Sequence, residues 1–168
     1  MALKEKIHED LKEAMKGKEE LTSSVLRMLI AAIITKEKEK RYKIGKGKPE
    51  MTEVELIEES QLTEEEVVDV LVSEVKKRKE SILSFEQGGR PELAEKEKKE
   101  AQILYKYLPE QMSEEELKKL IAQAVQKTGA KEQKDMGRVM AELMPKIKGK
   151  ADSGLVSKIV KDILLSQA

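Results

Sequence analysis

Apolar residues recur at three- and four-residue spacing along most of this chain, which predicts helices rather than strands. Residues 1–15 are amphipathic, whereas residues 21–34 are apolar on nearly every face and predict a helix at the centre of an N-terminal core. Residues 36–41 are polar all round, so this helix is expected to run out into solvent there. Helix breakers then end the pattern, at Gly45, Gly47 and Pro49.

Helix starts are marked by capping boxes, in which a Ser or Thr precedes a Glu by three residues. The three pairs are Thr52 with Glu55, Thr63 with Glu66, and Ser113 with Glu116. The first lies within residues 42–61, which are interpreted as a mobile loop holding a short helix. The second opens a helix of six turns or more that stops at Gly88 and Gly89, after which Pro91 suits the first turn of the next helix.

Pro109 breaks that next helix and predicts a domain boundary. Residues 1–109 are expected to form an N-terminal helical domain with long helices, and residues 110–168 a small three-helix domain. The last two connections are placed at residues 128–130 and 145–151, with Asp152 as the expected N-cap of the final helix. The fold class predicted is therefore all-α.

Composition supports this assignment and narrows the chemistry. Only four residues are aromatic and none is Trp, so Leu, Ile, Val, Met and Ala must build the core. Lys and Arg number 33, equal to Asp and Glu, so no overall charge draws the chain onto nucleic acid or a membrane. The absence of Cys excludes disulfides and thiolate metal sites, and a cytoplasmic location is expected. The longest apolar run, residues 28–34, is too short to span a bilayer, so no membrane association is expected.

Side chains for catalysis or for a cofactor are hard to find. His8 is the single histidine and sits on an otherwise plain surface helix, with no second imidazole to share a metal ion. The glycines lack the spacing and the strand-to-helix context of a phosphate-binding loop. The sequence therefore predicts no catalytic residue, no metal site and no cofactor.

Local charge is more informative than the total. Residues 36–48 hold seven basic and two acidic side chains, a net charge of +5, with Tyr42 among them. Residues 131–162 hold eight basic and five acidic side chains, a net charge of +3. Within that second segment, Lys146, Lys148 and Lys150 surround Gly149 beside a helix N-terminus, where phosphate groups are often bound. On charge alone, a solvated loop without a ligand explains the same residues equally well.

A family resemblance rests on several motifs in order. Residues 134–140 read KDMGRVM and are followed by LMP at 143–145 and GKAD at 149–152. These resemble the tail domain shared by the YqeY family and the GatB subunit of tRNA-dependent amidotransferases. Further motifs resemble YqeY proteins specifically: LRML at 26–29, KRKESI at 77–82, GGR at 88–90, and YLP at 107–109 with Gln111. The resemblance spans almost the whole chain except about residues 42–61.

The resemblance implies an N-terminal helical domain followed by a three-helix tail. In the amidotransferase this tail helps to hold tRNA, while activation and amidation belong to other domains, of which we find no counterpart in this sequence. The RNA-facing candidates are accordingly the tail cations Lys134, Arg138, Lys146, Lys148 and Lys150. A second basic surface, or alternatively a salt-bridged helix face, is predicted from Lys77, Arg78, Lys79 and Arg90.

Other motif residues have structural interpretations. Gly137 lies inside an expected helix, where close packing against another helix is favoured as its explanation. Asp135 and Asp152 are expected to cap helices, although Asp152 could also order the Gly149 loop for phosphate.

Three functions follow in order of preference. The first is a non-catalytic protein that binds tRNA or another structured RNA. The second is a protein-interaction module that docks on an aminoacylation or amidotransferase complex, a role that the Met-rich stripe of the tail would suit. The third is a carbon–nitrogen ligase with glutamine as amido donor, which is disfavoured because no ammonia-producing or phosphate-activating residues are visible.

Overall fold

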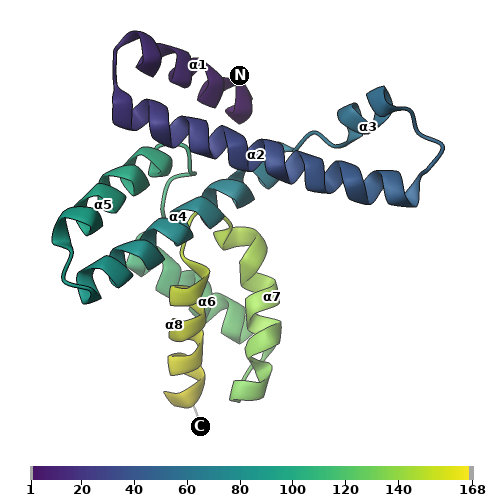
Figure 1. Ribbon diagram of the computed structural model, residues 1–168. Helices are drawn as coiled ribbons and strands as arrows, with labels where there is room; N and C mark the ends of the chain where they lie inside the picture. Colours follow the sequence, from purple (N-terminus) through teal and green to yellow (C-terminus); the bar gives the residue numbers. More distant parts are fainter. Residues whose placement is uncertain (1, 167–168) are drawn as a thin grey trace. The chain divides into compact units, whose positions relative to one another are not determined.

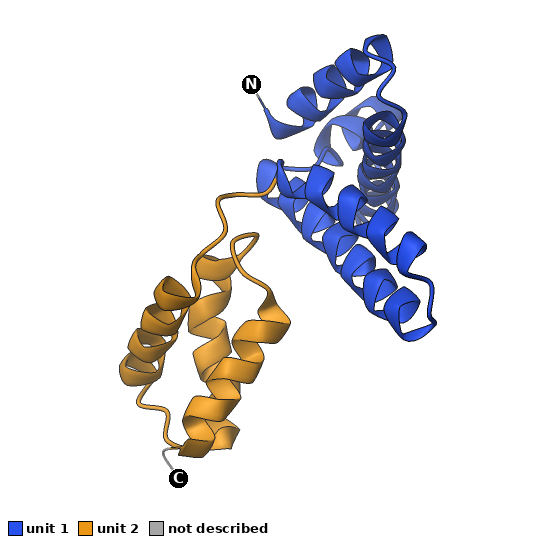
Figure 2. Ribbon diagram, turned by 90° about the vertical axis from the view of Figure 1, so that its left-hand side faces the viewer, with its two compact units in different colours: residues 1–107 blue, residues 108–168 orange. Residues whose placement is uncertain are grey.

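The fold is described from a computed structural model in which residues 2–166 are well placed. These residues form eight α-helices and one short 3-10 helix and contain no strand, which confirms the all-α prediction. The chain divides into two compact units, residues 1–107 and residues 108–168 (Figure 2). Each unit has its own buried core and is described by itself.

Unit 1 contains five helices (Figure 1). They are α1 (Leu3–Lys16), α2 (Glu20–Gly47), α3 (Glu53–Glu59), α4 (Glu64–Gln87) and α5 (Pro91–Tyr105). Helices α4 and α5 form a hairpin, and α2 packs against α1, α4 and α5. The core consists of aliphatic side chains, with Ile7, Leu26, Leu29, Leu71 and Leu104 among those almost completely buried.

The residues of unit 1 that were predicted to start or end helices are found at or near the helix ends in the structure. Thr52 and Thr63 cap α3 and α4, and in each case the Glu three residues later completes the capping box. Gly89 has a φ of 67°, the left-handed conformation that glycine adopts without strain, just beyond the end of α4. Pro91 occupies the first turn of α5.

Helix α2 follows its prediction in part. Its apolar half is not enclosed on every face, because Met28 and Ile34 are exposed. Its polar half runs out into solvent as expected, except that Glu37 is buried and forms an ion pair with Lys4 of α1. The helix also continues to Gly47, so the first part of the predicted loop at 42–61 is helical. Tertiary contacts, which local polarity does not reveal, account for these differences.

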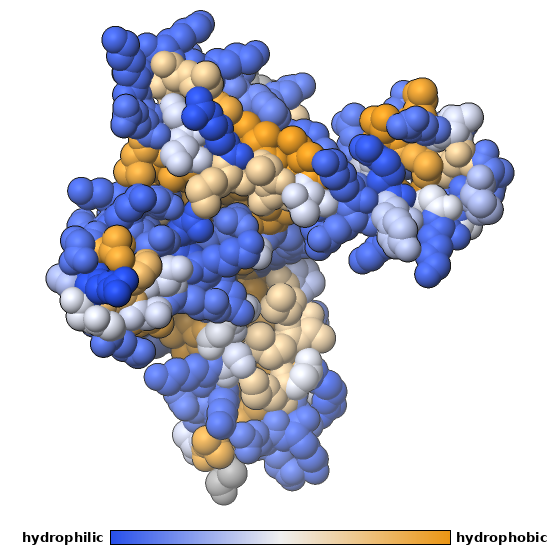
Figure 3. Space-filling view, viewed as in Figure 1, coloured by the Kyte–Doolittle hydropathy of each residue, from blue (hydrophilic) through white to orange (hydrophobic). Residues whose placement is uncertain are grey.

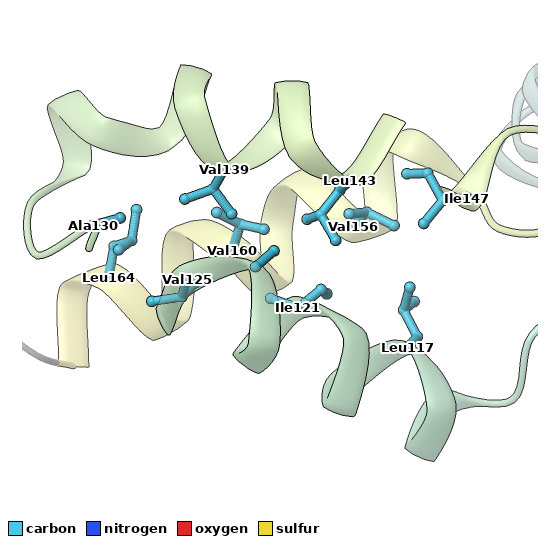
Figure 4. Packing of buried hydrophobic residues seen from close by; sticks show 11 residues of the cluster. Leu117, Ile121, Val125, Ala130, Val139, Leu143, Ile147, Val156, Val160 and Leu164 are labelled. Atoms are coloured by element: carbon cyan, nitrogen blue, oxygen red, sulfur yellow. The ribbon is translucent and has the colours of Figure 1, made fainter. Parts of the chain in front are cut away.

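Unit 2 is a three-helix bundle of α6 (Glu114–Thr128), α7 (Met136–Ile147) and α8 (Ser153–Ser166), with the 3-10 helix η1 (Gln133–Asp135) before α7. Side chains from all three helices point into one core (Figure 4), including Ile121, Leu143 and Val160, which are fully buried. The Ser113–Glu116 capping box opens α6 as predicted. Pro145 was expected in the connection but lies in the last turn of α7, so the connection starts only at Lys148.

No helix among the described residues combines the length and the apolar character that crossing a membrane requires.

Candidate nucleic-acid interface

Two of the predicted cations lie around the start of α7: Lys134 in the preceding 3-10 helix η1 and Arg138 in the first turn of α7. Both are exposed, and each has an acidic neighbour: Lys134 Nζ lies 2.8 Å from Glu132 Oε2, and Arg138 forms an ion pair with Asp135. Asp135 is buried and also accepts hydrogen bonds from the N–H groups of Lys131 and Glu132, at 3.0 and 3.2 Å. These interactions position both cations at the opening of the helix.

The role of Asp135 agrees with its prediction only in part. Its carboxylate completes the capping box of the 3-10 helix η1, whereas among the described residues no side chain caps the N-terminus of α7. Hydrogen bonding from the Lys131 N–H, followed by that from Arg138 and the Glu132 N–H, lowers the pKa of Asp135 to about 2. The carboxylate is therefore charged at neutral pH and keeps Arg138 near the start of α7.

Gly137 corrects a second prediction. It was expected to allow close helix packing, but it is exposed, and a Cβ built on it would meet no atom within 4 Å. It also lies within an α-helix, where glycine is unfavourable relative to alanine by about 1 kcal/mol. The packing of the fold therefore gives no reason for glycine at this position.

The other end of α7 carries Lys146. Its Nζ lies 2.8 Å from Glu142 Oε1, and Lys127 Nζ of α6 contacts the same oxygen at 2.8 Å. Hydrogen bonds from Lys127 and then Lys146 lower the pKa of Glu142 to about 2. Lys127 was not among the predicted residues, because only the packing of α6 against α7 brings it to this face.

The connection between α7 and α8 is held in a defined conformation. Gly149 is buried with a φ of 71°, and its carbonyl accepts a hydrogen bond from Gln111 Nε2 at 2.6 Å. The Lys150 carbonyl accepts another from the Met112 N–H at 2.8 Å. The Lys150 side chain is exposed and the Lys148 side chain half-buried. The backbone between α7 and α8 is thus fixed to the segment before α6, and Lys150 projects from it.

Asp152 caps α8, as predicted. Its Oδ1 accepts hydrogen bonds from the N–H groups of Gly154 and Leu155, at 2.8 and 3.1 Å. Because those two amides are already bonded, they are not free for a phosphate. Any anion at this loop would be bound by the lysine side chains rather than by the start of α8.

The five predicted tail cations thus fall into two groups at opposite ends of α7. Lys134 and Lys146 are twelve positions apart, which at about 1.5 Å per residue corresponds to roughly 18 Å. Arg138 and Lys146 are eight positions apart and share a helix face, with Glu142 between them. The bundle therefore presents an elongated row of charges of both signs rather than one dense cationic cluster.

The predicted second basic surface looks different in the structure. Arg78 is buried, with its Nε 3.0 Å from Glu100 Oε2 and 3.5 Å from Glu97 Oε2. Lys77 pairs with Glu74, and Lys79 Nζ lies 6.0 Å from the centre of the Tyr105 ring. Arg90 is exposed at the start of α5. Burial removes Arg78 from any basic surface, and its ion pairs match the alternative of a salt-bridged helix face.

Residues 2–166 contain no group of three or more His, Asp or Glu side chains arranged to hold a metal ion. The candidate interface consists of lysine and arginine side chains, which can bind an anion, and one exposed glycine.

The fold and this interface together define a class of protein: an all-helical chain with a separate three-helix unit that carries cations at both ends of its middle helix. The sequence pattern of the Yqey-like proteins matches residues 4–164, and the chain therefore belongs to the YqeY-like family. An uncharacterized protein of Schizosaccharomyces pombe is 30% identical over 107 residues, which cover 64% of this chain and 72% of the yeast protein.

Proposed function

We propose that unit 2 binds RNA, with tRNA as the first candidate, and that the chain acts by binding rather than by catalysis. The cations that would contact the phosphates are Lys134, Arg138, Lys146, Lys148 and Lys150. The observation that carries the proposal is the exposed Gly137 between Lys134 and Arg138, at a position where packing does not require glycine. The resemblance to a tRNA-holding tail domain supports the same function.

Gly137 suits such a role because glycine lets another molecule approach the backbone closely. It lies in the first turn of α7, where the helix dipole favours negative charge, although the N–H group of the preceding Met136 already bonds the Gln133 carbonyl of η1. Lys134 and Arg138 lie on either side of it in sequence and could hold phosphates that flank the contact. A side chain at residue 137 would separate the ligand from the backbone.

The loop at the other end of α7 would supply further contacts. Its backbone is held by Gln111 and Met112, so little backbone entropy would be lost when Lys150 meets a phosphate. The two ends lie on one rigid helix, which would fix the distance between the two phosphate contacts. Contacts to phosphates recognise the shape of the RNA backbone rather than the base sequence, as expected for a structured RNA.

The test is a fluorescence-anisotropy titration of the full chain with labelled bulk tRNA at several salt concentrations. The double variant Lys148→Ala/Lys150→Ala is expected to bind more weakly and to lower the slope of log affinity against log salt by about 2. The control Lys96→Ala/Lys99→Ala removes the same charge from exposed positions of α5 and should bind like the wild type. Absence of tRNA binding at every salt concentration would refute the proposal.

A second candidate function is docking onto a protein of an aminoacylation or amidation complex. Met144 and Leu155 are each 44% exposed on the three-helix unit, although both are apolar. Methionine side chains adapt to varied partner surfaces. If tRNA does not bind, recovery of a defined protein partner that survives nuclease treatment, and its loss in Met144→Glu, would favour this function.

A further inference from the structure

The C-terminal end of α2 and helix α3 form an arm, residues 38–60, that extends beyond the helices of the unit 1 core (Figure 1). Helix α3 packs against α2 alone among the described helices and contains no buried residue. The surface of the arm carries apolar and charged groups next to one another (Figure 3). The tail interface proposed above makes no use of this arm.

One face of the arm combines an aromatic ring with two cations. Lys38, Tyr42 and Lys46 are spaced four residues apart on α2 and therefore lie along one side of the helix. Tyr42 is 73% exposed. Within residues 2–166, neither Lys38 nor Lys46 forms an ion pair, and both side chains are exposed. The ring and both ammonium groups are thus free to meet a ligand.

A shallow depression of about 550 Å³ adjoins the ring. Its lining consists of Lys38, Arg41, Tyr42, Gly45, Lys46 and Leu56. Arg41 is held by its Nε, which donates to Ser60 Oγ at 3.1 Å, and Leu56 of α3 lies against Gly45. The surface of the depression is therefore almost wholly apolar, and its lysine and arginine side chains line it mainly with carbon atoms.

The acidic groups of this stretch of α2 are already neutralised. Glu37 is buried against Lys4, and Glu39 Oε2 lies 2.9 Å from Lys36 Nζ. On α3, Glu59 pairs with Lys48 at 3.1 Å, and Glu55 is engaged in the capping box with Thr52. An anionic ligand that stays on the α2 face of Lys38, Tyr42 and Lys46 would thus meet paired carboxylates, and among the described residues the unpaired ones of the arm's helices are Glu53 and Glu58 of α3.

We propose that the face formed by Lys38, Tyr42 and Lys46 binds single-stranded nucleic acid. A base stacks on the Tyr42 ring, and phosphates of the flanking nucleotides contact Lys38 and Lys46. Exposed aromatic rings within cationic grooves bind single strands in this way, with little sequence preference, because every base has a stacking face. The site lies in unit 1 and does not depend on the proposed tail interface.

Helix α3 argues against an anionic membrane as the ligand. It carries four glutamates, at positions 53, 55, 58 and 59, of which Glu53 and Glu58 form no ion pair within residues 2–166. These side chains would be repelled by an acidic bilayer brought against the arm. A narrow strand needs only the α2 side of the arm and avoids them.

The experiment measures binding of the full chain to a fluorescently labelled twelve-nucleotide oligouridine by anisotropy. Tyr42→Ala is expected to weaken binding about tenfold, whereas Tyr42→Phe keeps the stacking ring and should bind like the wild type. Lys38→Ala/Lys46→Ala should lower the salt slope by about 1.4, because single strands release fewer counterions per contact than duplexes. The control Lys96→Ala/Lys99→Ala should change neither quantity.

Two results would overturn this assignment. One is an oligouridine affinity that is the same in Tyr42→Ala as in the wild type, and the other is binding of the full chain to phosphatidylserine vesicles but not to oligouridine. Lys148→Ala/Lys150→Ala separates the two proposals, because it is expected to weaken tRNA binding while leaving the Tyr42-dependent binding of oligouridine intact. Circular dichroism of each variant should show unchanged helicity, since these side chains are exposed, apart from the half-buried Lys148, and none belongs to a core.

Discussion

Gly137 is the residue at which stability and binding are expected to conflict. Gly137→Ala should raise the free energy of unfolding by up to about 1 kcal/mol, because alanine favours the helix and its Cβ meets no neighbour. The same methyl group should weaken tRNA binding if the ligand approaches the backbone here. Urea unfolding and tRNA anisotropy on one protein preparation measure both effects. Unchanged tRNA affinity would show that Gly137 does not touch the ligand.

The pKa of Asp135 predicts a pH dependence of stability. Its pKa falls from an ordinary 3.8 to about 2 in the folded chain, so the charged carboxylate stabilises the folded state above the ordinary value and loses this effect as pH drops toward 2. Asp135→Asn should therefore lower the free energy of unfolding by a constant amount above about pH 5, and by less as pH falls. Urea unfolding of both proteins across this range measures the difference. A difference that grows on acidification would contradict the assignment.

At the scale of single residues, the sequence predicts helix caps well and contacts between side chains that are distant in the sequence poorly. The boxes at Thr52, Thr63 and Ser113 were correctly predicted because both partners lie within three residues of each other. Gly137 was misassigned because a glycine inside a helix suggested close packing against another helix. Its exposure depends instead on the orientation of α7 about its own axis in the bundle. Lys127 was missed because its partner Glu142 is fifteen residues away on another helix.

Between elements, the α4–α5 hairpin is held by a buried charge cluster. Arg78 of α4 faces Glu97 and Glu100 of α5, with Glu74 at 3.9 Å on its own helix. Arg78→Ala would leave these carboxylates without their shared cation and should cost about 3–5 kcal/mol of stability. Lys77→Ala, which removes an exposed cation from the next position, should cost less than about 1 kcal/mol. Equal urea midpoints for the two variants would mean that the cluster contributes little.

Helix α3 should be the least protected helix of unit 1. It has no buried residue and packs only on α2, where the Lys48–Glu59 pair and the Arg41–Ser60 hydrogen bond hold it. Its amides are expected to exchange hydrogen by local opening, faster than those of the first half of α2. Hydrogen exchange followed by mass spectrometry would measure both segments in one experiment. Equal protection of the two segments would contradict this order.

Element types were easier to predict than element ends. The apolar spacing of α4, α6 and α8 identified these helices, because their buried stripes follow the helical repeat. The end of α7 was predicted too early, since proline at 145 was treated as a stop. The end of α2 at Gly47 agrees with the predicted breakers, although the loop predicted at 42–61 begins inside this helix. Pro145 lacks the N–H that would bond the carbonyl of residue 141, but α7 continues for only two more residues before it ends, and Gly45 remains helical beside Leu56 of α3.

For the whole molecule, separate cores predict separate folding. The core of unit 2 consists entirely of residues between 112 and 164, and the hydrogen bonds of Gln111 and Met112 to the α7–α8 loop close the same unit. A chain of residues 108–168 is therefore expected to be helical and to unfold cooperatively, although its small core should make it only marginally stable. Circular dichroism during urea unfolding tests this expectation.

Binding by the two separate chains would then assign each ligand to its unit. Residues 108–168 should retain the salt-dependent binding of tRNA, because every proposed tail contact lies in that segment. Residues 1–107 should retain the Tyr42-dependent binding of oligouridine and lose most tRNA affinity. Anisotropy with both RNAs on both chains measures this, and Lys148→Ala/Lys150→Ala in the first chain and Tyr42→Ala in the second are the matched controls. The contrary result is that both short chains fold but neither binds RNA, while the full chain does. The ligand would then need both units at once. Each proposed interface would have to be extended with residues of the other unit.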